Sequence, residues 1–243
     1  MAARAARAAN AAANFSGRRA IVVGATSGIG EGIAKRLAAA NFTVTVVGRS
    51  AERGAEVVAA MSALGGTGHT FLACDSFKMR NIAECTRAYT AAHPEPLDVL
   101  VLSQGMATLQ GRTETDEGVD EKLALHYYGR MAFLANLLPA LRAAPSARVM
   151  SVLSAGVHSP YPHWAEDPEL RTHYSLKGAA DAAGFYNDLA VDALARDPAN
   201  AGITFAHAAP GFVATRLGTE MPTVVRWLVR GLQVLGKSPE ECA

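Results

Sequence analysis

A glycine-rich turn near the N-terminus is the first stretch of this chain whose residues could do chemistry. Residues 20–23 are apolar and largely β-branched, which predicts a short buried strand, and a helix is expected from Glu31 onward. Where a strand turns into a helix, free N–H groups and the positive end of the helix dipole converge on an anion. Glycines let such a turn approach a pyrophosphate without a Cβ in the way. The stretch therefore predicts a phosphate-binding turn, with a purely structural turn as the alternative.

The glycine spacing in this turn carries a family resemblance. Gly-x-x-x-Gly-Ile-Gly after a Val-rich strand resembles the short-chain dehydrogenase/reductase family, and the resemblance can be followed over residues 19–217. The resemblance implies a Rossmann-type fold that binds NAD or NADP, and departures described below are similar to those of divergent fungal members. It also implies that the cofactor is contacted by Gly24, Thr26, Ser27, Gly28, Ile29 and Gly30.

The choice between NAD and NADP depends on the end of the second predicted strand, residues 42–47. NAD-binding Rossmann proteins place an acid about 20 residues past the glycine turn to bind the ribose diol, whereas an Arg accommodates a 2′-phosphate. Here Gly48 takes the place of the acid and Arg49 follows it. NADP is therefore the expected cofactor and NAD the less favoured one. An exposed surface Arg is the alternative for Arg49, and Glu52 is interpreted as charge in the first turn of a helix.

The resemblance assigns further positions to the cofactor. Asp75, after the third predicted strand, matches an Asp that hydrogen-bonds the adenine, although a helix N-cap is an equal alternative. The family reads Asn-Asn-Ala-Gly after the fourth strand, and of these residues this chain keeps only Gly105. The turn is therefore expected to survive without the Asn hydrogen bonds. Around the nicotinamide, the resemblance implies roles for Pro210, Gly211 and Thr215.

The resemblance also names the expected catalytic residues, Ser154, Tyr174 and Lys177. Ser154-Ala-Gly follows the predicted strand at residues 148–153 and matches the family's catalytic Ser, whereas Ser151 is expected to be structural. In the family a Tyr-x-x-x-Lys pair follows, in which the Lys lowers the phenol pKa and binds the nicotinamide ribose, while the phenol moves a proton. Here Tyr174 and Lys177 are three residues apart. Both are expected on one face of a helix over residues 174–195.

Histidines stand where the family has other residues. If Lys177 holds the family position, His173 falls where the Tyr belongs: His173 could then be the acid/base group, Tyr174 could swing in, or the proton relay could be lost. His126 takes the place of an Asn that helps to hold a relay water; an imidazole both donates and accepts, and an ordinary packed His is the alternative. The loop pair around residues 158–163 lacks a third ligand, so no metal site is predicted.

The elements that must position these residues alternate along the chain. Strands are expected at residues 20–23, 42–47, 70–73, 97–102, 148–153 and 203–208, and helices from 31 onward and at 51–64, 79–92, 117–143 and 174–195. Such alternation predicts βαβ units and a parallel sheet. The expected fold is α/β, a Rossmann-type doubly wound sheet in three layers. It forms a single domain over residues 19–243, after an Ala- and Arg-rich extension over residues 1–18.

Length and composition fit one such domain. The chain has 243 residues, of which 50% are hydrophobic, and a net charge of +1. That balance argues against nucleic acid or an anionic membrane surface as the main partner, and no apolar run reaches the length of a membrane span. Cys74, Cys85 and Cys242 have neither disulfide nor metal spacing, which indicates reduced thiols and a cytoplasmic location. For the acid-poor N-terminal extension, a short solvated helix is favoured over a transit peptide.

The expected function is hydride transfer between NADP(H) and a small carbonyl or alcohol substrate. The alternative is a non-catalytic NADP-binding sensor or scaffold, favoured by the departures at Leu102, Ser103, His126 and His173. Ser238-Pro-Glu-Glu predicts the start of a helix just where the sequence stops. A seventh strand is therefore expected to be missing, and the uncovered sheet edge would favour a homo-oligomer.

Overall fold

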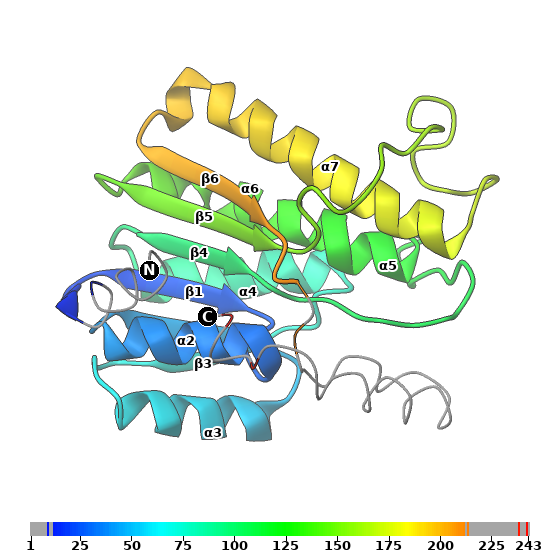
Figure 1. The fold of residues 1–243 in the computed structure, drawn as a ribbon. Helices are drawn as coiled ribbons and strands as arrows, with labels where there is room; N and C mark the ends of the chain where they lie inside the picture. The colour runs from blue at the N-terminus through cyan, green and yellow to red at the C-terminus, as the bar shows by residue number, and fades with distance from the viewer. Residues whose placement is uncertain (1–8, 10–11, 212, 214–237, 239–241, 243) are drawn as a thin grey trace.

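The computed structural model describes residues 9, 12–211, 213, 238 and 242. Its centre is one sheet of six parallel strands in the order β3-β2-β1-β4-β5-β6 (Figure 1). The strands are β1 (Arg19–Val23), β2 (Thr43–Gly48), β3 (Thr70–Ala73), β4 (Val99–Leu102), β5 (Ala147–Val152) and β6 (Ile203–Ala208). The order reverses between β1 and β4, the point at which open α/β sheets bind their ligands. The expected doubly wound Rossmann-type sheet is confirmed.

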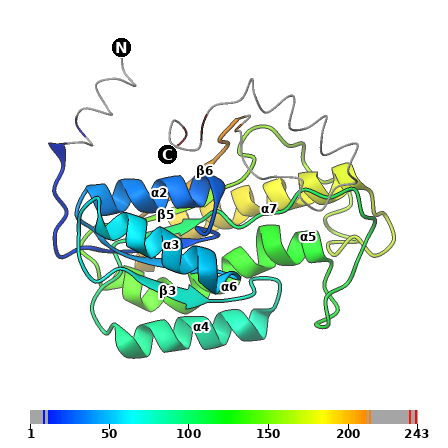
Figure 2. The same cartoon turned by 90° about the horizontal axis from the view of Figure 1, so that it is seen from below.

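Helices cover both faces of the sheet (Figure 2). They are α2 (Gly28–Ala39), α3 (Ala51–Ser62), α4 (Met79–Ala92), α5 (Glu121–Leu123), α6 (Gly129–Arg142) and α7 (Leu176–Arg196), with a π-helical turn at Ala124–Tyr128 and a 3₁₀ turn at Pro198–Asn200. Right-handed crossovers place α2 and α3 on one face of the sheet and the later helices on the other. This arrangement gives the three layers predicted from the sequence.

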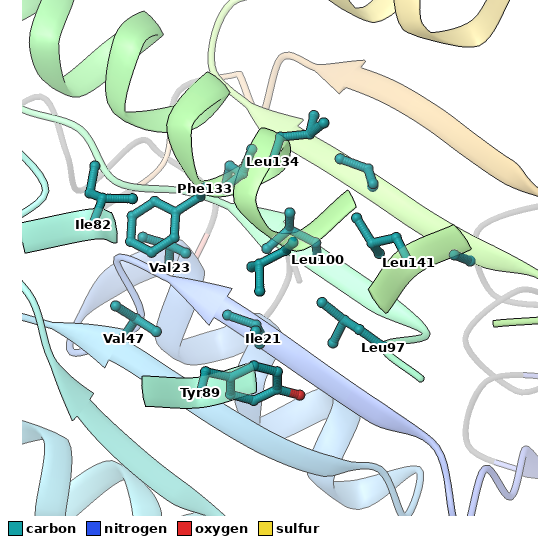
Figure 3. Packing of buried hydrophobic residues seen from close by; sticks show 14 of the residues in the cluster. Ile21, Val23, Val47, Ile82, Tyr89, Leu97, Leu100, Phe133, Leu134 and Leu141 are labelled. Atoms are coloured by element: carbon teal, nitrogen blue, oxygen red, sulfur yellow. The ribbon is translucent and has the colours of Figure 1, made fainter. Parts of the chain in front are cut away.

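Two apolar clusters join the sheet to its helices. Side chains alternate across a strand, so Val22 of β1 packs with α2 and α3 while Ile21 and Val23 pack with α4 and α6. On the second face Phe133 and Leu137 of α6 are fully buried, in a cluster that also contains Tyr89 of α4. Figure 3 shows Phe133 beside Val23 and Tyr89 beside Ile21. These clusters hold the carboxyl ends of the strands in one row, which is where the predicted site residues lie.

Three predicted helix starts are wrong. α2 begins at Gly28 rather than Glu31, and the helix expected from residue 117 begins at Glu121, after the Asp120 carboxylate accepts hydrogen bonds from the N–H groups of the first turn. α7 begins at Leu176, because Ser175 is its N-cap and the Ser175 hydroxyl accepts from the Gly178 N–H at 2.9 Å. Tyr174 therefore precedes the helix, and it does not share a helix face with Lys177.

The ends of the chain bear on two further expectations. Phe15 packs on Phe42, with ring centroids 4.9 Å apart, and its N–H donates to Ala40 O, so contact with the domain starts before the predicted boundary at residue 18. Within the described residues β6 forms the edge of the sheet. Thr215 and most of the segment from Ser238 lie outside the described residues, and with them the expectations about a missing seventh strand.

No helix in the described part of the chain is long and apolar enough to span a bilayer.

Candidate functional site

The glycine turn packs closely under the end of β4. Gly24 has φ +77°, and a Cβ there would stand 2.6 Å from the main-chain nitrogen of Gln104. A Cβ on Gly30 would stand 2.4 Å from the Ser103 hydroxyl, which itself donates to Val23 O at 2.7 Å. Both contacts are shorter than real Cβ atoms show, so these two positions require glycine. Ser103, where the family has Asn, ties β4 to β1 directly beneath the turn.

The N-terminus of α2 is open to a cleft. Its N-cap, Ser27, has an extended backbone and makes no side-chain hydrogen bond to the first turn. The first N–H groups of a helix lack intrahelical partners, so here they are available to an anion. The cleft, of about 350 Å³, is lined by residues that include Thr26, Ser27, Gly28, Glu31, Lys35 and Arg53. A phosphate group fits this donor set, although Lys35 is already ion-paired with Glu31.

A second cleft, of about 550 Å³, lies at the carboxyl ends of β2 and β3. Arg49 and Asp75 both line it, together with Cys74, Asn81, Glu84 and Cys85. The Arg49 guanidinium lies over the Phe77 ring, 5.5 Å from its centroid. A Cβ on Gly48 would stand 2.6 Å from a Thr26 methyl group, so an acid at this position would require the Thr26 side chain to shift. Arg53, which lines the first cleft, was not anticipated from the sequence, and its place in the first turn of α3 is the signal that could have found it.

Asp75 does not cap a helix. Its carboxylate accepts from Phe77 N–H at 3.3 Å within its own turn, whereas α4 begins at Met79 with Lys78 as N-cap. The first N–H groups of α4 are bound instead by the carboxylate of Glu117, at 2.7 Å and 3.2 Å. The N-cap alternative for Asp75 is therefore wrong. Sequence reasoning could not find the Glu117 cap, because 38 residues separate it from Met79.

Gly105 and His126 lie side by side. The His126 ring accepts from Met106 N–H at 3.0 Å through Nε2, and a Cβ on Gly105 would stand 3.4 Å from that atom. Burial lowers the pKa of His126 to about 3, so the ring is neutral and its remaining proton is on Nδ1. The main-chain carbonyl of His126 accepts from Asn187 at 2.9 Å. His126 therefore shapes the turn after β4, and the π-helical turn places it there.

Ser154 and the predicted Tyr-Lys pair lie apart. The Ser154 hydroxyl is buried and has no hydrogen-bond partner. Tyr174 donates to Gln110 O at 3.4 Å, and Lys122 lies over its ring. Lys177, with 75% of its side chain exposed, is ion-paired with Asp181. Neither side chain contacts Ser154, so this arrangement does not bring the three predicted catalytic residues together.

His173 lies on the surface in the loop before α7. Its ring stacks on that of His163, with centroids 4.0 Å apart, and its Nδ1 is 3.4 Å from Asp167. His158 faces Asp188 instead, so the two histidines of the predicted loop pair have separate surroundings. In the described part of the chain no three His, Cys, Asp or Glu side chains are placed to hold a metal ion.

A model of the short chain dehydrogenase family matches residues 18–224 of this chain. The chain belongs to the short-chain dehydrogenase family. An oxidoreductase of Emericella nidulans is 34% identical over 204 residues, which cover 82% of this chain and 60% of that protein. A polyprenol dehydrogenase of Mus musculus is 33% identical over 234 residues, which cover 93% of this chain and 69% of that protein. This chain thus spans between one half and two thirds of the Emericella oxidoreductase.

Solved structures agree with the family. A metagenomic short-chain oxidoreductase in complex with NADP superposes with a TM-score of 0.66 at 26% identity, covering 90% of this chain and 91% of its own. A short-chain dehydrogenase/reductase from Caenorhabditis elegans, solved with cofactor, has a TM-score of 0.73 at 23% identity. The match covers 93% of this chain and 85% of that one. This second likeness supports the fold alone.

This short-chain dehydrogenase also buries an arginine that the sequence did not reveal. Arg130 is 1% exposed, and its guanidinium donates to Leu102 O, Val152 O, Gln104 O and the Ser151 hydroxyl. Burial lowers the pKa of Arg130 to about 9. The Ser151 hydroxyl in turn donates to Asn187 at 2.8 Å. These bonds join β4, β5 and α7 in the interior, and they support the structural role expected for Ser151.

Proposed function

We propose that this chain is an NADP-dependent oxidoreductase that transfers hydride between NADP(H) and the carbonyl or alcohol group of a small molecule. The proposal combines family membership with the two clefts at the carboxyl end of the sheet. Relatives named for such chemistry include the mouse polyprenol dehydrogenase and a fatty acyl-CoA reductase of Acinetobacter baylyi, which is 31% identical over 172 residues. A cytoplasmic location and a homo-oligomer remain part of the proposal; buried free thiols at Cys74 and Cys85 support the former.

The preference for NADP over NAD rests on the pair Gly48 and Arg49. An acid at position 48 would collide with Thr26, and Arg49 lines the cleft that Asp75 shares. A guanidinium forms charge-assisted, bidentate hydrogen bonds with a phosphate. We propose that Arg49 binds the 2′-phosphate, that Asp75 binds the adenine, and that the turn from Gly24 to Gly30 binds the pyrophosphate at the N-terminus of α2. Lys177, Gly105, Pro210, Gly211 and Thr215 are proposed to surround the nicotinamide half.

In the reaction, the cofactor supplies or accepts the hydride. The Ser154 hydroxyl, which has no partner within the protein, is proposed to hydrogen-bond the substrate oxygen and to orient the carbonyl carbon. Tyr174 or His173 is proposed to exchange the proton with that oxygen. Since Tyr174 is bound to Gln110 O in this structure, its part in the reaction requires the loop before α7 to move.

The cofactor preference is tested by titrating NADPH and NADH against the unmodified protein and against Arg49→Ala. A charge-assisted hydrogen bond contributes roughly 1.5–3 kcal/mol, so NADPH should bind at least about tenfold more tightly than NADH, and Arg49→Ala should remove most of that difference. Arg196→Ala is the matched control, because Arg196 lies at the far end of α7 in an exposed pair with Asp192. Equal affinities for the two cofactors in the unmodified protein would refute the preference.

A non-catalytic NADP-binding protein is the second candidate, and the separation of Tyr174 and Lys177 from Ser154 favours it. Turnover of NADPH with a panel of ketones, quinones and aldehydes distinguishes the two candidates. If the phenol is the acid, Tyr174→Phe should lower kcat by about 10² or more while NADPH binding is unchanged. If the imidazole is the acid, His173→Ala should do so instead. A protein that binds NADPH and turns over nothing in either direction would establish the second candidate.

A further inference from the structure

Two imidazole rings hold the main chain of Ser154 from opposite sides. The Ser154 N–H donates to Nε2 of His207 at 3.1 Å. The Ser154 carbonyl is 2.9 Å from Nδ1 of His158. The side chains of His207 and His158 are only 3% and 8% exposed, respectively. Both polar groups of one peptide position are thus held by buried rings, although Ser154 lies in a loop after the end of β5.

Both rings contact the same carboxylate, that of Asp188. Nδ1 of His207 is 2.5 Å from Oδ1 of Asp188, and Nε2 of His158 is 3.1 Å from Oδ2 of Asp188. The rings are stacked with centroids 6.1 Å apart. One carboxylate on α7 therefore connects a residue of β6 and a residue of the loop after β5. We call Asp188, His158 and His207 the serine clamp.

The partners of each ring nitrogen determine where the protons are. His207 accepts from Ser154 N–H through Nε2, so its proton is on Nδ1 and points at Asp188. Burial lowers the pKa of His207 despite the opposing effect of Asp188, which agrees with a neutral ring. His158 faces an oxygen acceptor with each nitrogen, so it donates from both and carries a positive charge opposite the Asp188 carboxylate.

The clamp leaves the Ser154 hydroxyl without a partner. A Cβ on Gly184 of α7 would stand 2.6 Å from this hydroxyl oxygen and 2.4 Å from Nδ1 of His158. Glycine at position 184 thus lets α7 approach Ser154 and His158 together. A buried hydroxyl normally finds a partner inside the protein, and this one does not. The arrangement immobilises the main chain of Ser154 and keeps its side chain available for a ligand.

We propose that the serine clamp positions the Ser154 hydroxyl for the substrate oxygen, so that Asp188, His158 and His207 are positioning residues of the reaction. This inference rests on the proposed oxidoreductase function. It assigns to α7 a contribution to the active site that does not depend on Tyr174 or Lys177. A hydroxyl whose main chain is held in place before substrate binds loses less orientation freedom in the transition state.

Other charged groups surround the clamp. Asp181, ion-paired with Lys177, lies one to two helical turns before Asp188 on α7, and its carboxylate accepts from Ser159 N–H next to His158. Arg130 of α6 and the charge of His158 both act to lower the pKa of His207, in addition to its burial.

The first test is Asp188→Asn, with Asp192→Asn as the matched control one turn later on the same helix. An Asn keeps one acceptor oxygen but puts an NH2 donor in place of the other, so it cannot accept from an imidazole N–H at both oxygen positions of the carboxylate. We expect kcat to fall at least tenfold with the best carbonyl substrate of the panel, while the Kd for NADPH stays within twofold. Asp192, exposed and paired with Arg196, should tolerate the change without effect. Equal behaviour of the two variants would overturn the clamp and leave the proposed function standing.

A double-mutant cycle with Ser154→Ala tests whether the clamp acts through this hydroxyl. If it does, Asp188→Asn should cost less than twofold in kcat in the Ser154→Ala background. Two losses that multiply independently would overturn the inference. A loss of thermal stability in Asp188→Asn without a change in kcat or in its pH profile would show a structural role only, and would also overturn it.

Nitrogen NMR of the histidine rings gives a readout that needs no turnover. In the unmodified protein His158 should show two protonated ring nitrogens and His207 a proton on Nδ1 alone, and Asp188→Asn should change both patterns. A neutral His158 beside an unchanged His207 would overturn the clamp. If the rings behave as expected but no substrate of the panel is turned over, the proposed oxidoreductase function fails, and the clamp's role in positioning a substrate fails with it.

Discussion

The two halves of the site, at opposite sides of the point where the strand order reverses, are built in different ways. The half at the ends of β1 and β2 consists of glycine main chain packed against neighbouring main chain and short side chains, with glycines at Gly24, Gly30 and Gly48 where a Cβ would collide. The half at the ends of β5 and β6 consists of polar side chains that bind one another and the main chain, from Arg130 to His207. The first half can accept few changes. The second can exchange partners as long as each polar group stays satisfied.

This contrast explains where the chain follows its family and where it departs. A dinucleotide turn has to bring N–H groups close to a phosphate, and only glycine allows that approach. The proton-handling half has several chemical solutions, since any set of donors and acceptors that orients the substrate oxygen will serve. Departures at His126, His173 and the Tyr174–Lys177 spacing fall in or beside this second half, whereas the departure at Ser103 lies beneath the glycine turn, where its hydroxyl donates to Val23 O.

The largest expected effect separates two serines three residues apart. Ser154→Ala removes a hydroxyl without an internal partner, so kcat should fall by about 10²–10³ while stability and NADPH affinity hardly change. Ser151→Ala removes a group bound to both Arg130 and Asn187, so it should lower the free energy of unfolding by about 1–3 kcal/mol. Steady-state kinetics and urea unfolding of both variants measure this. The contrast between the two halves is lost if Ser151→Ala lowers kcat as much as Ser154→Ala does.

An intermediate effect is expected in the glycine half. A Cβ on Gly30 would stand 2.4 Å from the Ser103 hydroxyl and 2.5 Å from Gly24 O. Gly30→Ala should therefore strain the folded protein by about 1–3 kcal/mol and weaken NADPH binding by about tenfold to a hundredfold. Gly111→Ala is the matched control, because nothing lies within 4 Å of a Cβ there. Thermal unfolding and NADPH titration by fluorescence would distinguish them, and identical results for both would contradict a rigid glycine half.

The smallest effect concerns the loop that carries His173 and Tyr174 into α7. The Asp167 carboxylate accepts from the N–H groups of Arg171, Thr172 and His173, at 2.7 Å, 3.0 Å and 2.7 Å. Burial by itself would raise the pKa of Asp167, but these hydrogen bonds outweigh it and hold the pKa well below its usual range. Asp167→Asn should cost about 1 kcal/mol of unfolding free energy at neutral pH.

The pH dependence of that stability has a definite sign. The pKa of Asp167 is lower in the folded protein than in the unfolded chain. Its contribution to the free energy of unfolding is therefore complete above the unfolded pKa of about 3.9, and it is lost as pH falls through the lower pKa of the folded protein. Urea unfolding between pH 7 and pH 2 should therefore bring the unmodified protein and Asp167→Asn together at the acid end. Asp192→Asn, without such hydrogen bonds from the main chain, serves as the control. A difference that stayed constant with pH would show that the loop does not depend on this charge.

Much of the fold could be predicted from the sequence, because apolar strands, amphipathic helices and glycine turns are local patterns. The bounds of β3, α4 and β6 agree with the residues expected. The start of α7 was missed by two residues, since Ser175 competes with the earlier residues as N-cap and only the formed helix shows which one is used.

By itself the sequence determined the order of the strands and helices along the chain and the glycine turn, since each depends on residues close together in the chain. The tertiary structure alone decided that Glu117 caps α4, that Arg130 holds two strand ends, and that Asp188 joins the two rings around Ser154. Those contacts join residues 19 to 38 positions apart. A side chain's partner across such a distance depends on how helices pack on the sheet, and buried polar groups bind whatever partner that packing brings within hydrogen-bond distance.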